Sequence, residues 1–261
     1  MRNLLITIRY LGSGYHGFQV QDNALTVCQV FQDGVEKLLG RRWDVKGCSR
    51  TDSGVHAGRF CLSMLTDSPI PCMGLVRGLN SVLPPDVAVL DCREVPEDFH
   101  ARYSCRGKRY AYRFHNSLLR DPFLEGRVYR CGKPLDDAAM DRAAKAFLGT
   151  HDFSAFCSAG GSVEDKERTI FQADVRRQGE LVTYTVTGDG FLYNMVRIMA
   201  GTLLRVGEGR MAPEEMSQVI RSRERSRAGD TLPPWGLFLE EIYYDLPDWP
   251  RIPAFSPPDK E

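Results

Sequence analysis

The alternation of apolar and polar positions along the chain predicts a protein that mixes strands with helices. The N-terminal residues 3–10 alternate as a strand does. Further on, Gln178-Gly179-Glu180 separates two apolar runs and predicts a β-hairpin. The predicted strands are residues 3–10, 59–66, 87–95, 105–115, 170–177, 181–187 and 236–244.

Apolar positions at helical spacing predict the helices between these strands. Thr26 and Gln29 have the spacing of a capping box, and Gly40 follows the last position of that apolar face. A later helix carries an inner stripe formed by Met195, Ile198, Met199, Thr202 and Leu203. The predicted helices are residues 27–39, 71–83, 136–148, 191–206 and 213–222.

Antiparallel signals among these elements predict an α+β fold with two halves, each made of strands packed under helices. We expect an N-terminal half over residues 1–104 and a C-terminal half over residues 105–246. The remaining residues, 247–261, form a proline-rich tail. The sequence has no fixed-period repeat that would indicate a solenoid.

Composition places the chain among ordinary globular proteins. Of its 261 residues 43% are hydrophobic and 26% are charged, as is usual for a soluble domain. No apolar run approaches the roughly 18 residues of a membrane-spanning helix. Because the N-terminus also lacks the pattern of a signal peptide, we expect a cytoplasmic protein with no membrane partner.

Eight cysteines are spread along the chain, and no two are close enough to form a Cys-x-x-Cys pair. A structural zinc site is therefore not expected, and we predict no metal. Most of these cysteines fall in apolar runs, which is typical of small buried side chains in a reducing compartment.

Charge is balanced in total but distributed unevenly. The formal net charge is zero, yet residues 100–130 contain eight Lys or Arg against two acids, a net of +6. Residues 240–261 contain six acids against two bases, a net of −4. A basic region of this kind is consistent with nucleic-acid binding even in a neutral protein.

The predicted strand 105–115 interleaves cations with aromatic residues. Lys108, Tyr110 and Tyr112 would share one face of it, while Arg109, Ala111 and Arg113 share the other. Such a surface can hold phosphates and stack a base. The alternative is an amphipathic edge strand whose arginines extend their charged ends into water.

An acidic turn lies between two strand-like runs, at Cys48-Ser49-Arg50-Thr51-Asp52-Ser53-Gly54-Val55-His56-Ala57. A carboxylate on a tight turn is exposed yet firmly aimed, which suits a nucleophile or a base. The same residues also make a good purely structural turn, because Asp and Ser cap backbone N–H groups and Gly accepts positive φ. Both interpretations are open at this point.

Seven segments together make the chain similar to the TruA family of tRNA pseudouridine synthases. They occur in the family's order and extend from about residue 3 to residue 245. The turn Arg50-Thr51-Asp52-Ser53-Gly54-Val55-His56 resembles that family's catalytic turn. The other six are Tyr15–Gln21, Asp98–Arg102, Lys108–Tyr112, His151–Phe153, Phe191–Arg197 and Gly236–Leu239.

The resemblance implies a pseudouridine-synthase fold, with two α+β halves around a mixed, mainly antiparallel sheet and a central basic cleft. It implies an isomerase (an intramolecular transferase) that converts uridine to pseudouridine in the anticodon arm of tRNA, at positions 38, 39 and 40. It also implies a homodimer that works without a cofactor or metal.

The resemblance also assigns roles to individual residues. Asp52 would be the catalytic carboxylate, with Arg197 as its partner. Tyr110 would pack on the target uracil, Leu237 would line the pocket, and Arg50 would contact the RNA. Lys108 and Arg109, beside Tyr110, are expected to bind substrate.

The chemistry of the reaction agrees with these residue types. A carboxylate can add to the base, or assist at the sugar, and leave again, and the sequence does not choose between those routes. A buried arginine needs an anionic partner, and the target base must leave the helical stack to be reached.

The chain departs from the family's usual pattern at Phe18, Ser49 and Ser53. These departures remove no catalytic group.

Two other functions also fit some of these residues. Asp52-Ser53-Gly54 fits the signature of an aspartic protease, but that enzyme needs a second copy of the signature and this chain has one. A non-catalytic RNA-binding relative would need neither Asp52 nor Tyr110 nor Arg197.

Overall fold

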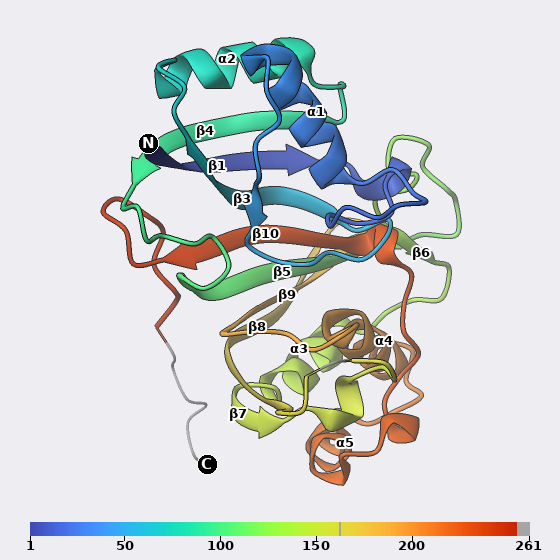
Figure 1. The fold of residues 1–261 in the computed structure, drawn as a ribbon. Helices are drawn as coiled ribbons and strands as arrows, with labels where there is room; N and C mark the ends of the chain where they lie inside the picture. The colour runs from blue at the N-terminus through green and yellow to red at the C-terminus, as the bar shows by residue number, and fades with distance from the viewer. Residues whose placement is uncertain (162, 255–261) are drawn as a thin grey trace. The chain divides into compact units, whose positions relative to one another are not determined.

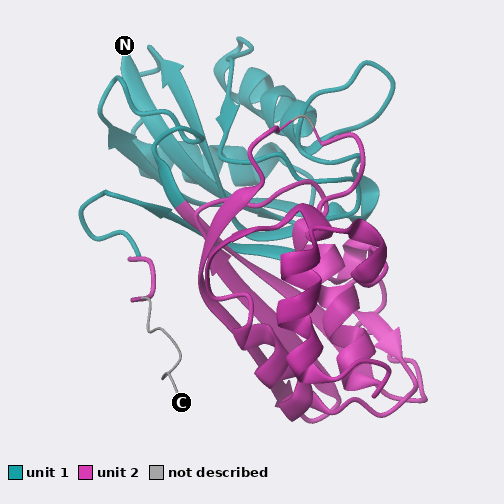
Figure 2. Cartoon of the chain, turned by 90° about the horizontal axis from the view of Figure 1, so that it is seen from below, with its two compact units in different colours: residues 1–106, 238–250 teal, residues 107–237, 251–261 magenta. Residues whose placement is uncertain are grey.

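The computed structural model describes residues 1–161 and 163–254 (Figure 1). The chain divides into two compact units (Figure 2). Unit 1 consists of residues 1–106 and 238–250, and unit 2 consists of residues 107–237 with the described part of 251–261. Each unit has a mixed, mostly antiparallel sheet with helices packed on it, which confirms the predicted α+β class.

The sheet of unit 1 has the strand order β4-β1-β3-β10. Strand β1 (Arg2–Tyr10) lies between β3 (His56–Thr66) and β4 (Val87–Val95) and is antiparallel to both. The short β2 (Lys46–Gly47) pairs antiparallel with β3. By contrast, β10 (Leu237–Tyr244) runs parallel to β3, with Phe238 opposite His56. The central position of β1 explains why its side chains from Leu4 to Ile8 are almost wholly buried.

Helices α1 (Val27–Leu39) and α2 (Cys72–Val82) pack against each other, and α2 packs against β4 (Figure 1). The hydroxyl of Thr26 accepts a hydrogen bond from the backbone N–H of Gln29, and Gly40 ends α1 at a φ of 70°. Both ends of α1 therefore lie where the capping residues predict.

The sheet of unit 2 has the strand order β5-β9-β8-β7, and its neighbours along this path are antiparallel. These strands are β5 (Cys105–Asn116), β7 (Gly149–Asp152), β8 (Glu167–Gln178) and β9 (Leu181–Gly188). A short β6 (Tyr129–Cys131) pairs in parallel with the end of β5. The hairpin predicted around Gly179 is therefore formed by β8 and β9.

The helices of unit 2 are α3 (Asp137–Lys145), α4 (Met195–Gly207) and α5 (Met216–Ser222). Helix α3 packs on β8 and on α4. The five residues of the predicted inner stripe of α4 are all buried. Single turns of 3-10 helix occur at Gly12–Gly14, Ser154–Phe156, Pro213–Glu215, Arg225–Arg227 and Pro234–Gly236.

Some element bounds differ from the prediction. Helix α4 begins at Met195 rather than at residue 191, because Asn194 has a φ of 60° and cannot belong to a right-handed helix. Strand β7 is absent from the predicted strands, and it pairs with β8. The last long strand, β10, groups from Phe238 onward with unit 1, whereas the predicted halves assigned residues 105–246 to one half.

Across residues 1–161 and 163–254, no helix has both the length and the apolar character needed to cross a membrane.

Candidate functional site

The acidic turn connects β2 to β3, so the expectation of a turn between two strands is confirmed. Within it the backbone N–H of Val55 donates to the carbonyl oxygen of Asp52 over 3.2 Å, and Gly54 has a φ of 80°. The side chain of Asp52 is half-buried and that of Ser53 is exposed. The carboxylate therefore lies near the tip of a closed turn.

The glycine-rich loop before α1 holds this turn through backbone contacts. The carbonyl oxygen of Tyr15 accepts from the N–H of Gly54 over 3.1 Å and from the hydroxyl of Ser53 over 3.3 Å. The N–H of Phe18 donates to the carbonyl oxygen of Thr51 over 3.3 Å. Residues on both sides of Asp52 are thus fixed to one loop, which limits how far the carboxylate can move.

Three contacts with neighbouring elements support the base of the turn. The hydroxyls of Tyr10 and Thr51 share a hydrogen bond of 2.9 Å. His56 is wholly buried, and its Nδ1 accepts from the N–H of Gly12 over 2.9 Å. Its ring stacks on Phe238 with centroids 4.6 Å apart. These buried contacts make the base of the turn part of the core of unit 1.

The loop is itself anchored by Tyr15. The phenol of Tyr15 donates to Oδ1 of Asp86 over 2.7 Å. Burial raises the pKa of this phenol above its ordinary value, and the hydrogen bond to Asp86 raises it further. Tyr15 therefore stays a neutral donor over the physiological pH range.

Tyr110 lies on β5 in unit 2, where it pairs with Val186 of β9. Its side chain is buried and meets the ring of Phe191 edge to face, with centroids 5.2 Å apart. This contact fixes the plane of the Tyr110 ring. The sequence analysis did not single out Phe191 for this role, although Phe191 belongs to one of the seven segments.

Arg197 lies in the first turn of α4. Its Nε donates to the carbonyl oxygen of Leu232 over 2.6 Å, and its Nη1 donates to Oδ1 of Asn194 over 2.8 Å. Asn194 is held in turn by its bond to the hydroxyl of Ser158 over 3.0 Å. These two bonds to neutral acceptors orient the guanidinium.

Leu237 follows residues 233–236, which pack against Tyr112 in unit 2. The phenol of Tyr112 donates to the carbonyl oxygen of Pro233 over 2.8 Å, and burial raises its pKa. A Cβ at Gly236 would lie 2.7 Å from the Tyr112 ring, so only glycine fits there. Leu237 itself is buried. Tyr112 is predicted to lie on a strand face that could stack a base, but its side chain is fully buried and, with Gly236, supports the segment before Leu237.

The candidate residues are divided between the two units. Asp52 and Arg50 belong to unit 1, and the set in unit 2 consists of Lys108, Arg109, Tyr110, Arg197 and Leu237. The pairing of Asp52 with Arg197 and the central basic cleft stay predictions. In the part of the chain that the structure describes, Nε of Arg109 is buried without a hydrogen-bond partner.

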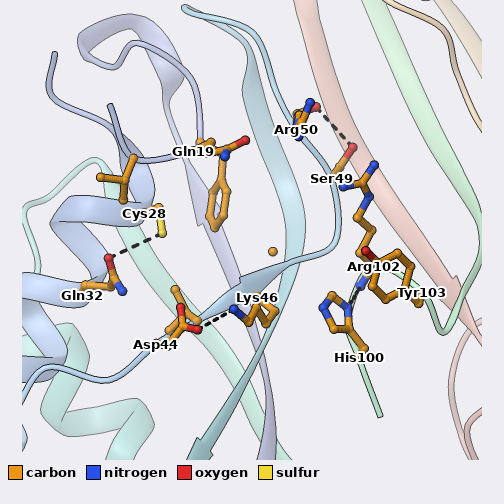
Figure 3. Close-up of a pocket in the computed structure, with 14 residues that line it drawn as sticks. Gln19, Cys28, Gln32, Asp44, Lys46, Ser49, Arg50, His100, Arg102 and Tyr103 are labelled. Atoms are coloured by element: carbon orange, nitrogen blue, oxygen red, sulfur yellow. Dashed lines mark hydrogen bonds and ion pairs between the residues drawn. The ribbon is translucent and has the colours of Figure 1, made fainter. Parts of the chain in front are cut away.

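Arg50 is exposed, and together with Ser49 it lines a cavity of about 440 Å³ in unit 1 (Figure 3). The opposite wall is formed by the loop before α1 and by the start of that helix. The remaining lining residues are Phe18, Gln19, Val20, Cys28, Gln32, Asp44, Val45, Lys46, Gly47, His100, Arg102 and Tyr103.

Comparison with known proteins identifies the family. The profile of a family described as tRNA pseudouridine synthase matches residues 6–104 and 143–245. Strand β5 with Tyr110 lies between these two ranges. A chain of a solved Cbf5-Nop10-Gar1 complex aligns with 77% of this chain and 54% of its own, at 11% identity and a TM-score of 0.35.

Curated relatives cover nearly the whole chain. Three proteins named tRNA pseudouridine synthase A align with 94% of this chain and 100% of their own length. They come from Acetivibrio thermocellus at 46% identity, Ruminiclostridium cellulolyticum at 44% and Clostridium acetobutylicum at 43%. On the extent of both matches, the chain belongs to the tRNA pseudouridine synthase family.

Proposed function

We propose that this protein isomerises uridine to pseudouridine at positions 38, 39 and 40 of the anticodon stem-loop of tRNA, with Asp52 as the catalytic nucleophile. Its relatives named tRNA pseudouridine synthase A support the reaction and the class of substrate. The observation that carries the role of Asp52 is its position on a turn fixed from two sides, by the backbone of Tyr15 and Phe18 and by the buried His56.

The reaction breaks the bond between C1′ and N1, turns the base, and joins C5 to C1′. The proton on C5 leaves and N1 gains a proton, so the net change is an isomerisation. Asp52 would form a transient bond to the base or to the sugar carbon and would be released when the new C–C bond is complete. Because no electrons are gained or lost overall, the reaction requires no redox cofactor.

Tyr110 would contact the target uracil through its ring face. The edge-to-face contact with Phe191 supports this role, since it sets the ring plane before the base arrives. The phenol could then carry the C5 proton away from the base. Leu237 would close the apolar side of the same pocket.

Arg197 would balance the negative charge of Asp52 in a site from which water is displaced. Its bonds to Leu232 and Asn194 support this role because they fix the orientation of the guanidinium. A fixed cation beside a carboxylate lowers the cost of keeping that carboxylate ionised away from water.

Substrate binding would rest on Arg50, Lys108 and Arg109, which offer positive charge to RNA phosphates. We further infer a homodimer, which the family resemblance implies. A cytoplasmic location follows from tRNA as the substrate.

Replacing Asp52 tests the proposal. We expect Asp52→Ala to lower the single-turnover rate of pseudouridine formation in a tRNA transcript by about a thousandfold or more, because the nucleophile is gone. The dissociation constant for tRNA should stay within about twofold, because phosphate contacts are retained. Carbodiimide mapping of the modified positions gives the rate, and fluorescence anisotropy gives the binding constant.

Asp67→Ala is the matched control, because the Asp67 carboxylate is 66% exposed at the far end of β3. It should leave both quantities unchanged. Full activity of Asp52→Ala, or pseudouridine formation only outside positions 38 to 40, would contradict the proposal.

A further inference from the structure

The cavity beside the acidic turn has one wall formed by the tight turn at residues 100–104 (Figure 3). Ala101 is fully buried, its N–H donates to the hydroxyl of Ser63 over 3.1 Å, and its carbonyl oxygen accepts from the phenol of Tyr244 over 2.6 Å. The turn is closed by reciprocal bonds between His100 and Ser104, of 3.1 and 2.9 Å. Its backbone is therefore rigid.

This rigid turn presents the ring of Tyr103 to solvent. The side chain of Tyr103 is 77% exposed, although its hydrophobic ring would be more stable if covered. The imidazole of His100 lies 4.4 Å from the Tyr103 ring, between centroids. The Arg102 guanidinium lies 5.9 Å from the centroid of the same ring. An exposed ring held in place in this way is a ready platform for stacking a nucleobase.

The charges around the cavity favour an anionic ligand. Lys46 is ion-paired with Asp44 over 2.5 Å. Within residues 1–161 and 163–254, neither Arg50 nor Arg102 is ion-paired with a carboxylate. Two arginine side chains at one cavity, both exposed and neither neutralised, can hold a phosphate group.

A polar side chain on the opposite wall completes the set of groups that a nucleotide needs. Gln19 is exposed, and its amide lies across the cavity from Arg102 and Tyr103 (Figure 3). An amide offers both a donor and an acceptor to the edge of a base. The volume of about 440 Å³ falls in the range of small-molecule sites.

We propose that this cavity binds one nucleotide of the substrate tRNA that has left the helical stack and is distinct from the target uridine. Its base stacks on Tyr103, its phosphate binds Arg50 and Arg102, and Gln19 contacts the base edge. The inference rests on the proposed function, because it takes the RNA to be that enzyme's substrate. The inference adds to the proposed function a second unstacked nucleotide, which binds against the cavity wall formed by residues 100–104.

The test compares tRNA binding by four variants. Tyr103→Ala should weaken tRNA binding about tenfold, while Tyr103→Phe keeps the ring and stays within about twofold. Arg102→Ala should also weaken binding and lower the slope of log Kd against log salt by about 0.7, the value of one single-strand phosphate contact. Arg77→Ala removes an exposed arginine of α2 that does not line the cavity, and it should change neither quantity.

A crosslink gives a second, independent measurement. A tRNA transcript that carries 4-thiouridine, irradiated on the wild-type protein, should crosslink to the peptide containing Tyr103. Uridine 5′-monophosphate at millimolar concentration should not prevent that crosslink, because the isolated nucleotide lacks the contacts made by the rest of the RNA. Full protection by the mononucleotide would identify a free-nucleotide site instead and overturn the proposal.

The outcomes separate this inference from the function on which it rests. Suppose the wild-type protein forms pseudouridine while Arg102→Ala and Tyr103→Ala bind tRNA as Arg77→Ala does. The nucleotide site is then wrong and the enzymatic function stands. If the wild-type protein forms no pseudouridine but both variants still lose tRNA affinity, the enzymatic function is wrong and the RNA-binding cavity stands.

Discussion

At the residue scale, Gly17 shows how a residue with no side chain can position the turn that carries Asp52. It has a φ of 83°, and a Cβ built on it would lie 2.4 Å from the carbonyl oxygen of Thr51. The loop before α1 can therefore approach the acidic turn only because this residue has no side chain. The neighbouring N–H of Phe18 donates to the same carbonyl oxygen. The position of the turn that carries Asp52 thus depends on a residue with no side chain.

Gly17→Ala should therefore impair both stability and activity. We expect the free energy of unfolding to fall by about 1–3 kcal/mol, from the positive φ and from the clash with Thr51. The rate of pseudouridine formation should fall more than about tenfold, because the turn must move to relieve the clash. Urea denaturation and single-turnover assays measure the two effects.

Gly40→Ala serves as the control for backbone strain alone. Gly40 also has a positive φ, of 70°, but a Cβ there would meet nothing within 4 Å. This variant should lose about 1 kcal/mol of stability and keep its rate. If Gly17→Ala kept its rate as well, the close approach to Thr51 would have no part in aiming Asp52.

At the scale of elements, α3 is joined to β8 by a small charged cluster. Nζ of Lys145 lies 2.6 Å from Oδ1 of Asp174 and 3.0 Å from Oδ1 of Asp141. Burial by itself would raise the pKa of Asp174, but hydrogen bonds from Lys145 and Gln172 outweigh it and hold that pKa below its ordinary value. The folded state therefore favours the ionised carboxylate.

This lowered pKa predicts how stability depends on pH. A carboxyl group whose pKa is lower in the folded state contributes stability above its unfolded pKa, near 3.9, and loses that contribution as the pH falls through the folded value. The wild-type protein should be more stable than Asp174→Asn at pH 7, and the difference should shrink as the pH falls below about 3.9. Urea denaturation from pH 7 to pH 3 measures it.

Asp67→Asn, at an exposed carboxylate, is the control and should follow the wild-type protein throughout. A difference between wild type and Asp174→Asn that did not shrink between pH 5 and pH 3 would show that packing, not charge, joins the helix to the strand.

Elements set by local signals could be predicted from the sequence, and elements set by distant pairing could not. The capping hydroxyl of Thr26 and the positive φ of Gly40 are local, and α1 has the predicted bounds. Strand β7 exists because Gly149–Asp152 pairs with β8, and its four residues alone look like a turn. In the same way, β3 begins at His56 rather than at residue 59, because His56 pairs with Phe238 of the parallel strand β10.

At the scale of the whole molecule, the residues proposed for the site are far apart in the sequence and belong to different units. The local sequence around Asp52 predicts a turn that could carry a catalytic acid, and the pattern of strand 105–115 puts Tyr110 on a face that could stack a base. The role of Arg197 came from the family resemblance. Local sequence gave no signal for the supporting contacts of Tyr110 with Phe191 or of Arg197 with Leu232, because these are tertiary contacts. Tyr103 likewise becomes notable only when its exposure is known.

Whole-molecule electrostatics make one further prediction. The formal net charge is zero, so tRNA is not attracted by an overall charge, and the salt dependence of binding reports local phosphate contacts. Four proposed contacts, at Arg50, Arg102, Lys108 and Arg109, correspond to a slope of log Kd against log salt near 3, at about 0.7 each. Raising the salt from 50 to 200 mM should then weaken tRNA binding about fiftyfold.

Removing one of these charges should lower the slope of log Kd against log salt by the amount that one phosphate contact contributes, and by no more. Lys108→Ala and Arg50→Ala should each reduce it by about 0.7, while Arg77→Ala should leave it unchanged. Fluorescence anisotropy titrations at four or more salt concentrations measure the slopes. A flat salt response of the wild-type protein would exclude phosphate contacts as the basis of binding. A steep response that no single variant alters would instead place those contacts elsewhere on the molecule.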